Sequence, residues 1–270
     1  MRAGRLGVIG WPVAHSRSPA MQQAAFAELG LDGWSYQLLP VPPELFAETV
    51  RALPAAGFVG ANVTVPHKRS AFELADSASA SARAIGAANT LLFDAAGRIH
   101  AENTDAPGLI EALPFDVAGL RAVVLGAGGS GRSAAFALRE AGARVAIWNR
   151  TPGRAQTLAE DLAVRAIERV EPADLLVNCT TVGLDEGSRG AQDALQALGL
   201  RADLVAGYAY VVDFVYARGG TQLLALAREH GVSVIDGIDI LVAQGAISFE
   251  LWTGLPAPRG AMARAAREDA

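Results

Sequence analysis

The chain has 270 residues, 51% of them hydrophobic and 19% charged, which excludes a disordered protein and suits one large or two modest domains. Its 23 Lys and Arg residues against 28 Asp and Glu residues give a formal net charge of -5 at pH 7, which excludes a general binder of nucleic acids or anionic membranes. A local basic site for a small phosphate group is still compatible with this charge.

No apolar run approaches the roughly 20 residues that a membrane helix needs, and the first residues lack the pattern of a signal peptide. Cys179 is the single cysteine, so it cannot form an internal disulfide, and no cluster of Cys and His residues offers a zinc site. We therefore expect a soluble cytoplasmic protein that holds no metal and has neither nucleic acid nor a membrane as its partner.

Short apolar, β-branched runs alternate with helical patterns along the first part of the chain. They predict strands over residues 6–9, 34–39 and 57–63, and helices over residues 19–29 and 43–52. Ser18 is expected to cap the first helix, with Pro19 at the first helical position. This alternation predicts a mostly parallel sheet covered by helices.

The middle of the chain repeats the alternation more regularly. It predicts strands over residues 121–125, 144–148, 174–178, 211–214 and 232–235, with helices over 131–141 and 152–162. This is the βαβαβ pattern of a doubly wound sheet. A long helix is predicted over residues 238–252, and the Ala- and Arg-rich tail over 261–270 predicts either a terminal helix or a frayed end.

Two alternating blocks predict an α/β fold with two domains, and Pro107, Pro114 and Gly119 interrupt the chain between them. We assign residues 1–104 to an N-terminal α/β domain and residues 105–237 to a Rossmann-type, doubly wound domain. The C-terminal helices over residues 238–270 are expected to pack back on the first domain.

A glycine-rich loop follows the first strand of the second block. It reads Gly126-Ala127-Gly128-Gly129-Ser130-Gly131, which fits the G-x-G-x-x-G pattern between a strand and a helix. Glycines permit the tight turn and a close approach to a pyrophosphate, and the helix N-terminus supplies amide donors and a positive dipole end. The loop therefore predicts a dinucleotide site, the alternative being an ordinary glycine-rich turn.

The residues after the next strand indicate which dinucleotide binds. An NAD site usually has Asp or Glu there to accept from the ribose 2′-hydroxyl, but this chain has Asn149-Arg150-Thr151, with Arg154 one helical turn later. A guanidinium matches the geometry of a 2′-phosphate, so the sequence favours NADP over NAD. The alternative is a pair of solvated surface arginines.

Four polar motifs of the first block carry side chains of the types that bind ligands or take part in catalysis. Ser16-Arg17-Ser18-Pro19 places two hydroxyls before a helix, where they can hold a small carboxylate, although simple capping is equally open. Residues 62–68 read Asn62-Val63-Thr64-Val65-Pro66-His67-Lys68 and run from a strand end into a turn. Lys68 is the only lysine of the chain, and lysine exchanges a proton more readily than arginine, the alternative being an exposed turn lysine.

The other two motifs are Gly86-Ala87-Ala88-Asn89-Thr90 and Asn103-Thr104-Asp105. Both present amide, hydroxyl or carboxylate groups that suit a substrate with several hydroxyls, and both are also compatible with ordinary Asx or ST turns. For His15 and His67, which show no ligand spacing, we expect turn or core roles.

In this order and spacing, the motifs resemble the shikimate dehydrogenase family over nearly the whole chain, from residues 10–19 to Gln244 and residues 252–254. The resemblance implies an NADP-dependent oxidoreductase that reversibly reduces 3-dehydroshikimate to shikimate, in the shikimate pathway of aromatic amino-acid biosynthesis. It implies that the first domain binds the substrate and the second binds NADPH. A homodimer is compatible with the resemblance, but no pattern in the sequence specifies it.

The resemblance also implies the roles of individual residues. Lys68 and Asp105 form the catalytic pair, in which the carboxylate favours the charged lysine and Lys68 donates the proton. Ser16 and Ser18 bind the substrate carboxylate, and the ring contacts come from Thr64, Lys68, Asn89, Asp105, Tyr216 and Gln244. The cofactor contacts come from Gly126, Ala127, Gly128, Gly129, Ser130, Asn149, Arg150, Thr151, Arg154, Thr180, Val182 and Gly237.

The chain departs from the family pattern at several positions. Gln22-Gln23 stands where His-Asn is frequent, Leu184 and Ile240 replace methionines of the nicotinamide pocket, and Cys179 replaces a small residue. None of these positions belongs to the proposed catalytic pair.

Two alternative functions are open at this stage. One is a paralogue that acts on quinate or an amino analogue with NAD or NADP, against which Ser18 and Arg150 argue. The other is a non-catalytic NADP-binding sensor of the same fold, against which the presence of both Lys68 and Asp105 argues. Turnover by the purified protein distinguishes these alternatives.

Overall fold

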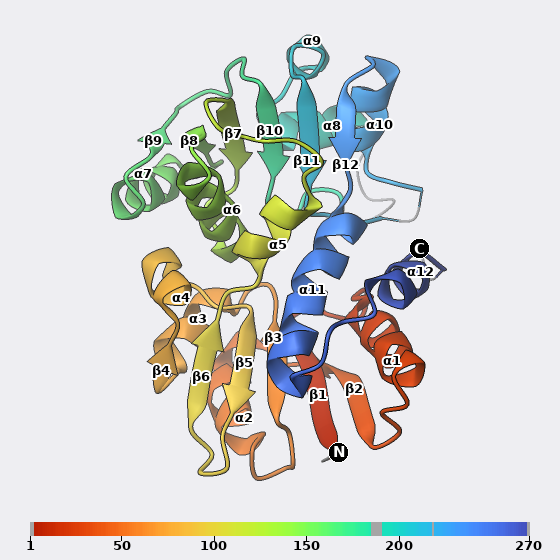
Figure 1. Ribbon diagram of the computed structural model, residues 1–270. Helices are drawn as coiled ribbons and strands as arrows, with labels where there is room; N and C mark the ends of the chain where they lie inside the picture. The colour runs from red at the N-terminus through yellow and green to blue at the C-terminus, as the bar shows by residue number, and fades with distance from the viewer. Residues whose placement is uncertain (1–2, 185–190, 218, 269–270) are drawn as a thin grey trace. The chain divides into compact units, whose positions relative to one another are not determined.

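The computed structural model describes residues 3–184, 191–217 and 219–268, and Figure 1 shows its helices and strands. The described residues form two compact units: unit 1 contains those up to Gly108 and those from Leu241 to Glu268, and unit 2 contains those from Leu109 to Ile240. The chain leaves unit 1 within helix α5 (Asp105–Ala112) and returns to it within helix α11 (Gly237–Thr253). The boundaries drawn from the sequence, after residues 104 and 237, fall close to these positions.

Unit 1 contains a six-stranded sheet of order β2-β1-β3-β5-β6-β4. Its strands are β1 (Gly4–Gly10), β2 (Trp34–Pro40), β3 (Gly60–Val63), β4 (Ser77–Ala78), β5 (Thr90–Phe93) and β6 (Ile99–Glu102). The predicted parallel pairing holds for β1 with β2 and with β3, whereas β5 runs antiparallel to both β3 and β6.

A tight turn explains the antiparallel part of this sheet. Between β5 and β6, Asp94 Oδ1 accepts hydrogen bonds from the amides of Ala96 (2.9 Å) and Arg98 (2.8 Å), and Gly97 adopts a φ of 77°. The chain therefore reverses directly, without a crossover helix. As a consequence, the amino end of β5 lies at the same edge of the sheet as the carboxyl ends of β3 and β6.

The helices of unit 1 that precede α5 are α1 (Ser18–Glu28), the 3₁₀ turn η1 (Pro43–Leu45), α2 (Phe46–Ala52), α3 (Lys68–Leu74) and α4 (Ala80–Ile85). The prediction that Ser18 caps α1 is wrong: Ser18 is already helical, and Arg17 occupies the cap position without a side-chain hydrogen bond. The Ser18 amide instead donates to Ser16 Oγ at 3.3 Å, so the earlier serine supplies the acceptor.

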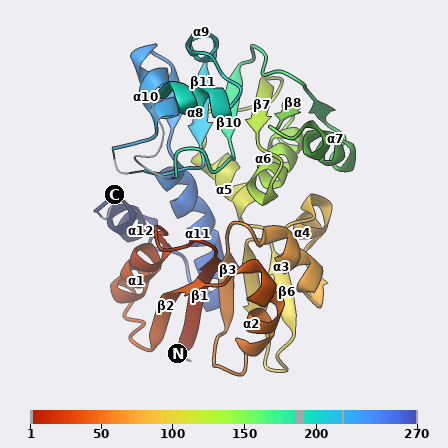
Figure 2. The same cartoon turned by 180° about the vertical axis from the view of Figure 1, so that it is seen from behind.

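The C-terminal helices pack back on unit 1, as predicted. Helix α12 (Arg259–Glu268) lies against α1, and both views of the ribbon show the two helices side by side (Figures 1 and 2). Phe249 of α11 contacts Phe26 of α1, with ring centroids 5.8 Å apart, and Gln22 Nε2 donates to the Gly245 carbonyl at 2.9 Å. These contacts fix the part of α11 that carries Gln244.

Unit 2 contains a sheet in which every pairing is parallel, of order β12-β11-β10-β7-β8-β9. Its strands are β7 (Arg121–Leu125), β8 (Arg144–Trp148), β9 (Arg165–Ala166), β10 (Leu175–Asn178), β11 (Tyr210–Asp213) and β12 (Ser233–Ile235). Numbered within the unit, this is the order 3-2-1-4-5-6 of dinucleotide-binding domains. The order reverses between β7 and β10, where such sheets bind their ligands.

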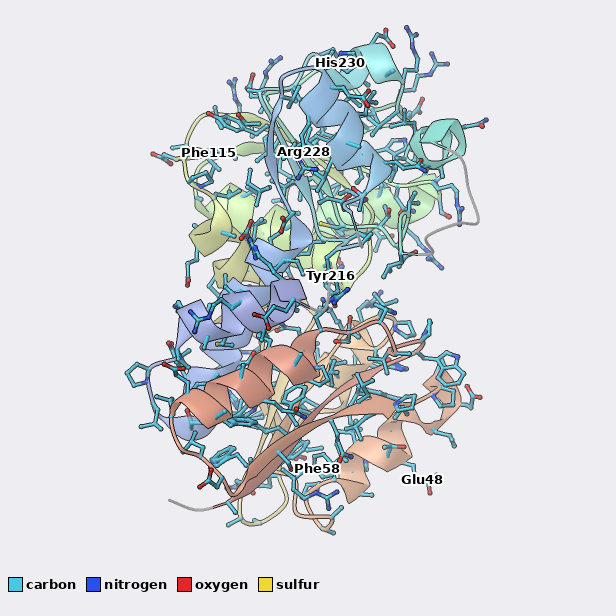
Figure 3. The ribbon with its side chains drawn as sticks, turned by 90° about the vertical axis from the view of Figure 1, so that its right-hand side faces the viewer. Glu48, Phe58, Phe115, Tyr216, Arg228 and His230 are labelled. Carbon is cyan, nitrogen blue, oxygen red and sulfur yellow. The ribbon has the colours of Figure 1, made fainter. Side chains whose placement is uncertain are left out.

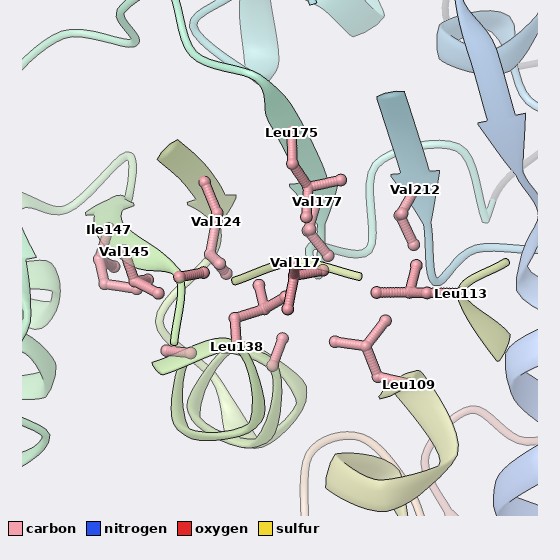
Figure 4. Close-up of a cluster of buried hydrophobic side chains, with 14 of the residues drawn as sticks. Leu109, Leu113, Val117, Val124, Leu138, Val145, Ile147, Leu175, Val177 and Val212 are labelled. Carbon is pink, nitrogen blue, oxygen red and sulfur yellow. The ribbon is translucent and has the colours of Figure 1, made fainter. Parts of the chain in front are cut away.

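Helices cover both faces of this sheet, so its strands are apolar on both sides. The helices that follow α5 in unit 2 are α6 (Gly129–Glu140), α7 (Pro152–Asp161), α8 (Ala191–Ala197), α9 (Ala202–Val205) and α10 (Gln222–Glu229). Val124 belongs with Leu138 of α6 and Leu109 of α5 to one buried cluster (Figure 4), whereas the neighbouring Val123 belongs with Leu224 of α10 to another. This alternation is why the strands read as continuous apolar runs.

Neither unit contains a helix, among the residues described above, that is long and apolar enough to cross a membrane. Within the same residues, no group of three or more His, Cys, Asp or Glu side chains could hold a metal ion.

The glycine loop of unit 2 gives a stability prediction. A Cβ on Gly131 would lie 2.0 Å from the Gly126 carbonyl oxygen, so helix α6 can approach β7 only with glycine there. We expect Gly131→Ala to lower the free energy of unfolding by about 1–3 kcal/mol, measured by urea denaturation. Gly153→Ala is the matched control, because a Cβ there meets nothing within 4 Å, and it should leave stability unchanged or slightly raised. Equal stability of the two variants would contradict this reading.

Candidate active site

A buried ion pair lies at the edge of the unit 1 sheet where β3, β5 and β6 meet. Lys68 begins α3, just after the turn that follows β3, and Asp105 begins α5, just after β6. Lys68 Nζ lies 2.6 Å from Asp105 Oδ2, and the two side chains are only 10% and 7% exposed. The alternative of an exposed turn lysine is therefore wrong, and the only lysine of the chain is held against a carboxylate.

Asn89, at the amino end of β5, orients the carboxylate of this pair. Its Nδ2 lies within hydrogen-bond distance of Asp105 Oδ1 (2.9 Å), Thr104 Oγ1 (2.9 Å) and Gln244 Oε1 (3.1 Å). Its Oδ1 accepts from the Thr104 amide at 2.7 Å. Both oxygens of Asp105 are thus engaged, one by Lys68 and one by Asn89, which holds the carboxylate in one orientation.

Gln244 reaches this cluster because α5 and α11 approach closely. A Cβ on Gly108 would lie 2.7 Å from the backbone nitrogen of Gln244, so a larger residue at 108 would push the two helices apart. Gln244 Nε2 donates to the Leu241 carbonyl at 2.8 Å, which leaves Oε1 directed at Asn89. The structure therefore brings together Lys68, Asn89, Asp105 and Gln244, four residues that the sequence named as one site.

A second layer of buried polar residues supports the site, and the sequence analysis missed it as a unit. Asn62 Nδ2 donates to Ser248 Oγ (3.0 Å) and Thr90 Oγ1 (3.1 Å), and Tyr36 Oη donates to Asn62 Oδ1 (2.8 Å). Thr90 and Ser248 both lie within hydrogen-bond distance of Thr104. The available signal was Asn62 itself, a polar residue inside an otherwise apolar strand.

His67 fixes the backbone directly before Lys68. Its ring stacks on Phe46 at a centroid distance of 4.5 Å, and its Nε2 lies 2.7 Å from the Val41 carbonyl oxygen. Burial lowers the pKa of His67 below its ordinary value, and the hydrogen bond to Val41 opposes this effect in part. The ring is therefore assigned as neutral, with Nε2 donating to Val41. His67 has the core role that we expected for it.

Ser16 and Thr64 lie on two loops at the same edge of the sheet, and Ser18 begins α1 directly after the first of these loops. The loops after β1 and β3 are joined by hydrogen bonds from the Trp11 amide to the Val65 carbonyl (3.0 Å) and from the Thr64 amide to the Ile9 carbonyl (2.8 Å). Ser18 is buried on the first turn of α1, close to the Ser16 hydroxyl. These three hydroxyls therefore lie on neighbouring segments, which follow β1 and β3. The Asn89–Asp105–Gln244 cluster lies on other elements, namely the start of β5, α5 and α11.

In unit 2, the glycine loop has the features that a pyrophosphate requires. Gly126 adopts a φ of 102°, and Gly128 precedes α6 without any side-chain cap. A Cβ on Gly128 would meet nothing within 4 Å, so the backbone there is open to a ligand. The residue at the cap position of α6 is thus a glycine without a side chain, which suits the anionic diphosphate of a dinucleotide.

The loop after β8 is tied to the glycine loop. Asn149 Oδ1 accepts from the Ala127 amide at 3.2 Å, and its Nδ2 donates to the Thr151 carbonyl at 2.9 Å. Arg150 and Arg154 are exposed, and neither forms an ion pair with an acidic side chain of the described part of the chain. Two such guanidinium groups, one on the loop after β8 and one on the first turn of α7, suit pairing with a 2′-phosphate.

Thr180 and Val182 lie on the turn that follows β10, beside the glycine loop. A Cβ on Gly126 would lie 3.1 Å from Thr180 Cγ2. Thr180 Oγ1 donates to Asn178 Oδ1 at 2.8 Å and accepts from the Val182 amide at 3.1 Å. The carboxyl ends of β7 and β10 therefore present their loops together, at the point where the strand order reverses.

Tyr216 lies beyond the end of β11, and Gly237 lies at the start of α11. A Cβ on Gly237 would lie 2.7 Å from the Phe214 carbonyl oxygen, so the start of α11 packs tightly on the chain that leads to Tyr216 (Figure 3). Asp213, which lies in the strand predicted over residues 211–214 and received no role there, is fully buried at the end of β11. No charge pattern in the sequence indicated that it is buried.

These features define a two-unit α/β oxidoreductase of the pyridine-nucleotide class. Unit 2 supplies the parallel sheet, the glycine loop and two exposed arginines, and unit 1 supplies the buried Lys–Asp pair. Comparison with known proteins identifies the family. Models for the shikimate dehydrogenase substrate binding domain, for shikimate / quinate 5-dehydrogenase and for the shikimate 5'-dehydrogenase C-terminal domain match residues 8–91, 110–181 and 237–267.

Individual relatives agree with these matches. The chain is 46% identical to a shikimate dehydrogenase (NADP(+)) of Thermus thermophilus over 268 residues, 97% of each chain. The crystal structure of a shikimate 5-dehydrogenase from the same species, in complex with NADP(H) and shikimate, matches with a TM-score of 0.86 and 42% identity over 99% of this chain and 100% of that one. A 5-ketofructose reductase of Gluconobacter matches at 0.83 and 28% identity, covering 99% of both chains. The chain belongs to the shikimate dehydrogenase family.

The geometry around Asn89 gives a second prediction. In Asn89→Asp, a carboxylate oxygen would face Asp105 Oδ1 and Gln244 Oε1, which the amide now approaches as a donor. We expect a loss of about 2 kcal/mol or more in the free energy of unfolding at pH 7.5, because a buried donor is replaced by a like charge. The loss should shrink as the pH falls and the new carboxylate is protonated.

Asn89→Ala is the control for this prediction, since it removes the hydrogen bonds without adding a charge. Thermal unfolding of both variants at pH 7.5 and pH 5.5 makes the comparison. A pH-independent loss, equal in the two variants, would mean that the amide fills space rather than orients Asp105.

Proposed function

We propose that this protein is an NADP-dependent shikimate dehydrogenase, which reversibly reduces 3-dehydroshikimate to shikimate in the shikimate pathway of aromatic amino-acid biosynthesis. The observation that carries the proposal is the buried contact of 2.6 Å between Lys68 and Asp105, surrounded by the amides of Asn89 and Gln244. In this proposal unit 1 binds the substrate and moves the proton, and unit 2 binds the cofactor. The family relationship supports both assignments.

The proton chemistry follows from the ion pair. When bound, NADPH would supply a hydride to the ketone carbon of 3-dehydroshikimate. Lys68 holds its ammonium group against the ketone oxygen, stabilises the negative charge that develops there and gives up one proton to it. In the reverse direction the neutral amine takes that proton from the substrate hydroxyl. Asp105 keeps Lys68 in position and accepts a hydrogen bond from a neighbouring substrate hydroxyl.

The other polar groups of unit 1 suit the rest of the substrate. In the proposal Ser16 and Ser18 bind the carboxylate, and Thr64, Asn89 and Gln244 contact the ring hydroxyls. Hydroxyls and amides serve a substrate with several hydroxyls well, because each of them both donates and accepts. Tyr216 of unit 2 is proposed as a further substrate contact.

The proposed cofactor site uses the three loops of unit 2. The pyrophosphate would lie on the glycine loop, contacted by Gly126, Ala127, Gly128, Gly129 and Ser130. The 2′-phosphate would lie against Asn149, Arg150, Thr151 and Arg154. Thr180, Val182 and Gly237 would flank the nicotinamide side. The open backbone at Gly128 and the exposed arginines support this arrangement.

One assay tests the function. Reduction of NADP⁺ or NAD⁺ is followed by nicotinamide absorbance with shikimate and, separately, with quinate. We expect rapid turnover with shikimate and NADP⁺. If kcat/KM with quinate or with NAD⁺ equals that with shikimate and NADP⁺, the protein is a quinate-type paralogue instead. If the protein binds its ligands but turns over none of the pairs, it is an NADP-binding sensor instead. The cytoplasmic location and the homodimer stay predictions, which cell fractionation and analytical ultracentrifugation decide.

Lys68→Met tests the proton donor. The methionine fills the lysine volume but cannot donate, so kcat should fall about 10²–10⁴-fold while the KM values for shikimate and NADP⁺ change little. Because the change leaves the buried Asp105 without its cation, the melting temperature must be measured alongside to count folded enzyme only. A folded variant with near-normal kcat would remove Lys68 from the mechanism.

Arg150→Ala tests the choice of cofactor. Loss of a charge-assisted hydrogen bond to the 2′-phosphate should lower the preference for NADPH over NADH about 10- to 100-fold, with NADH kinetics unchanged. Arg144→Ala is the matched control, because Arg144 is an exposed arginine at the other end of β8. Unchanged preference in Arg150→Ala, or an equal change in the control, would place recognition of the 2′-phosphate elsewhere.

A further inference from the structure

Unit 2 contains a buried carboxylate that the proposed reaction does not use. We propose that Asp213 is a positioning residue, which joins the carboxyl ends of β10 and β11 and thereby holds the turn over residues 178–183 in the conformation that accepts the dinucleotide. This inference rests on the proposed function, because it assumes that the turn is part of a cofactor site.

Asp213 is fully buried and accepts hydrogen bonds on both of its oxygens. Its Oδ1 accepts from Asn178 Nδ2 (2.9 Å) and from the Val215 amide (3.0 Å), and its Oδ2 accepts from Thr221 Oγ1 (2.7 Å). Asn178 and Asp213 are direct partners in the parallel register of β10 and β11, so their side chains leave the same face of the sheet side by side. The carboxylate therefore joins the two strands at their ends, beyond their backbone ladder.

The chemistry of these neighbours requires an acceptor at position 213. An amide, a backbone N–H and a hydroxyl all donate to it, so a carboxylate satisfies all three, whereas an Asn side chain would direct its own N–H₂ at one of them. Burial raises the pKa of Asp213 to about 7, and the hydrogen bonds from Thr221, Val215 and Asn178 act in the opposite direction. Burying a carboxylate costs free energy because the group loses its hydration. A carboxylate that is buried nevertheless is typical of a site where its oxygens are needed as hydrogen-bond acceptors.

One series of hydrogen bonds leads from Asp213 to Thr180, whose side chain lies beside the glycine loop. Because Asn178 Nδ2 donates to Asp213, the amide cannot flip, and Asn178 Oδ1 faces the Thr180 amide (3.0 Å) and Thr180 Oγ1 (2.8 Å). Thr180 Oγ1 in turn accepts from the Val182 amide at 3.1 Å. Thr180 and the backbone of Cys179 lie against Gly126, so the orientation of one buried amide sets the backbone beside the glycine loop.

The other hydrogen bonds act on the chain that carries Tyr216. Val215 precedes Tyr216 and donates to Asp213 directly. Thr221 follows it, donates to Asp213 and accepts from the Leu224 amide at 3.3 Å, which caps α10. Asp213 therefore anchors the backbone on both sides of Tyr216 as well as the turn after β10.

The experiment measures the Kd of NADP⁺ by calorimetry on the full chain for Asp213→Asn and Thr221→Val, with shikimate turnover and melting temperature alongside. Asp213→Asn removes one acceptor oxygen, and Thr221→Val removes one donor at nearly constant volume. We expect the Kd of NADP⁺ to rise at least 10-fold in both, with KM for NADP⁺ rising more than kcat falls. Thr221→Ser, which keeps the hydroxyl, should restore the Kd to within about threefold of the original.

Tyr208→Phe is the matched control for stability. Tyr208 precedes β11 and donates to the Glu171 carbonyl at 2.7 Å, so this variant also removes a hydrogen bond in unit 2, but at the other end of β11. It should lower the melting temperature about as much as Thr221→Val does, and leave the Kd of NADP⁺ unchanged. Thr221→Val keeps the test valid if Asp213→Asn does not fold.

The possible results separate this inference from the proposed function. If Thr221→Val and Tyr208→Phe lower the melting temperature equally and both bind NADP⁺ like the original, Asp213 is merely structural and the inference is overturned while the function stands. If the original chain binds NADP⁺ but does not oxidise shikimate, the proposed function fails, and a selective loss of NADP⁺ affinity in Thr221→Val still supports the positioning role.

Discussion

The structure of unit 1 depends on burying a lysine and an aspartate together. A buried ion pair is stable only where the remaining hydrogen-bonding capacity of both groups is met, because desolvation otherwise exceeds the attraction between the charges. Here Asn89 donates to the second oxygen of Asp105. The layer formed by Asn62, Thr90 and Ser248 is hydrogen-bonded in turn to Asn89 and Thr104. The antiparallel course of β5 is what makes this possible, since it brings the amino end of that strand to the edge where Lys68 and Asp105 lie.

Unit 2 buries a carboxylate by different means. Asp105 has a cation as its partner, Lys68, which in the proposed mechanism exchanges a proton with the substrate. The donors that surround Asp213 in the described residues are neutral, namely Asn178, Thr221 and the Val215 amide, and none of them exchanges a proton in a reaction near neutral pH. The two acids thus illustrate two uses of one residue type, and the partners, not the burial, distinguish the proposed catalytic role from the positioning role.

The sequence predicted the features that depend on neighbours along the chain. The glycine loop and the alternation of strands and helices in unit 2 are local patterns, and the structure has both. The β5–β6 hairpin was missed because a short Asp94–Gly97 turn was not weighed against the surrounding alternation. The predicted cap of α1 was wrong because the helix begins one residue earlier than expected, at Ser18, whose amide donates to Ser16. The partnership of Asn178 with Asp213 joins residues 35 positions apart, and only strand order and register reveal it.

The choice of lysine at position 68 has a physical reason within the proposed mechanism. The chain has 23 Lys and Arg residues, and every one except Lys68 is an arginine. Arginine serves wherever a permanent charge or a planar donor is enough, as in the exposed pairs of unit 2 and at Arg150. A group that must lose a proton to substrate and regain it cannot be a guanidinium, whose pKa lies far above neutral pH. Position 68 therefore requires an amine, although arginine is the cation at every other basic position of the chain. Asp105 holds this amine by its ion pair and His67 fixes the backbone before it, and neither of them donates the proton in the proposed mechanism.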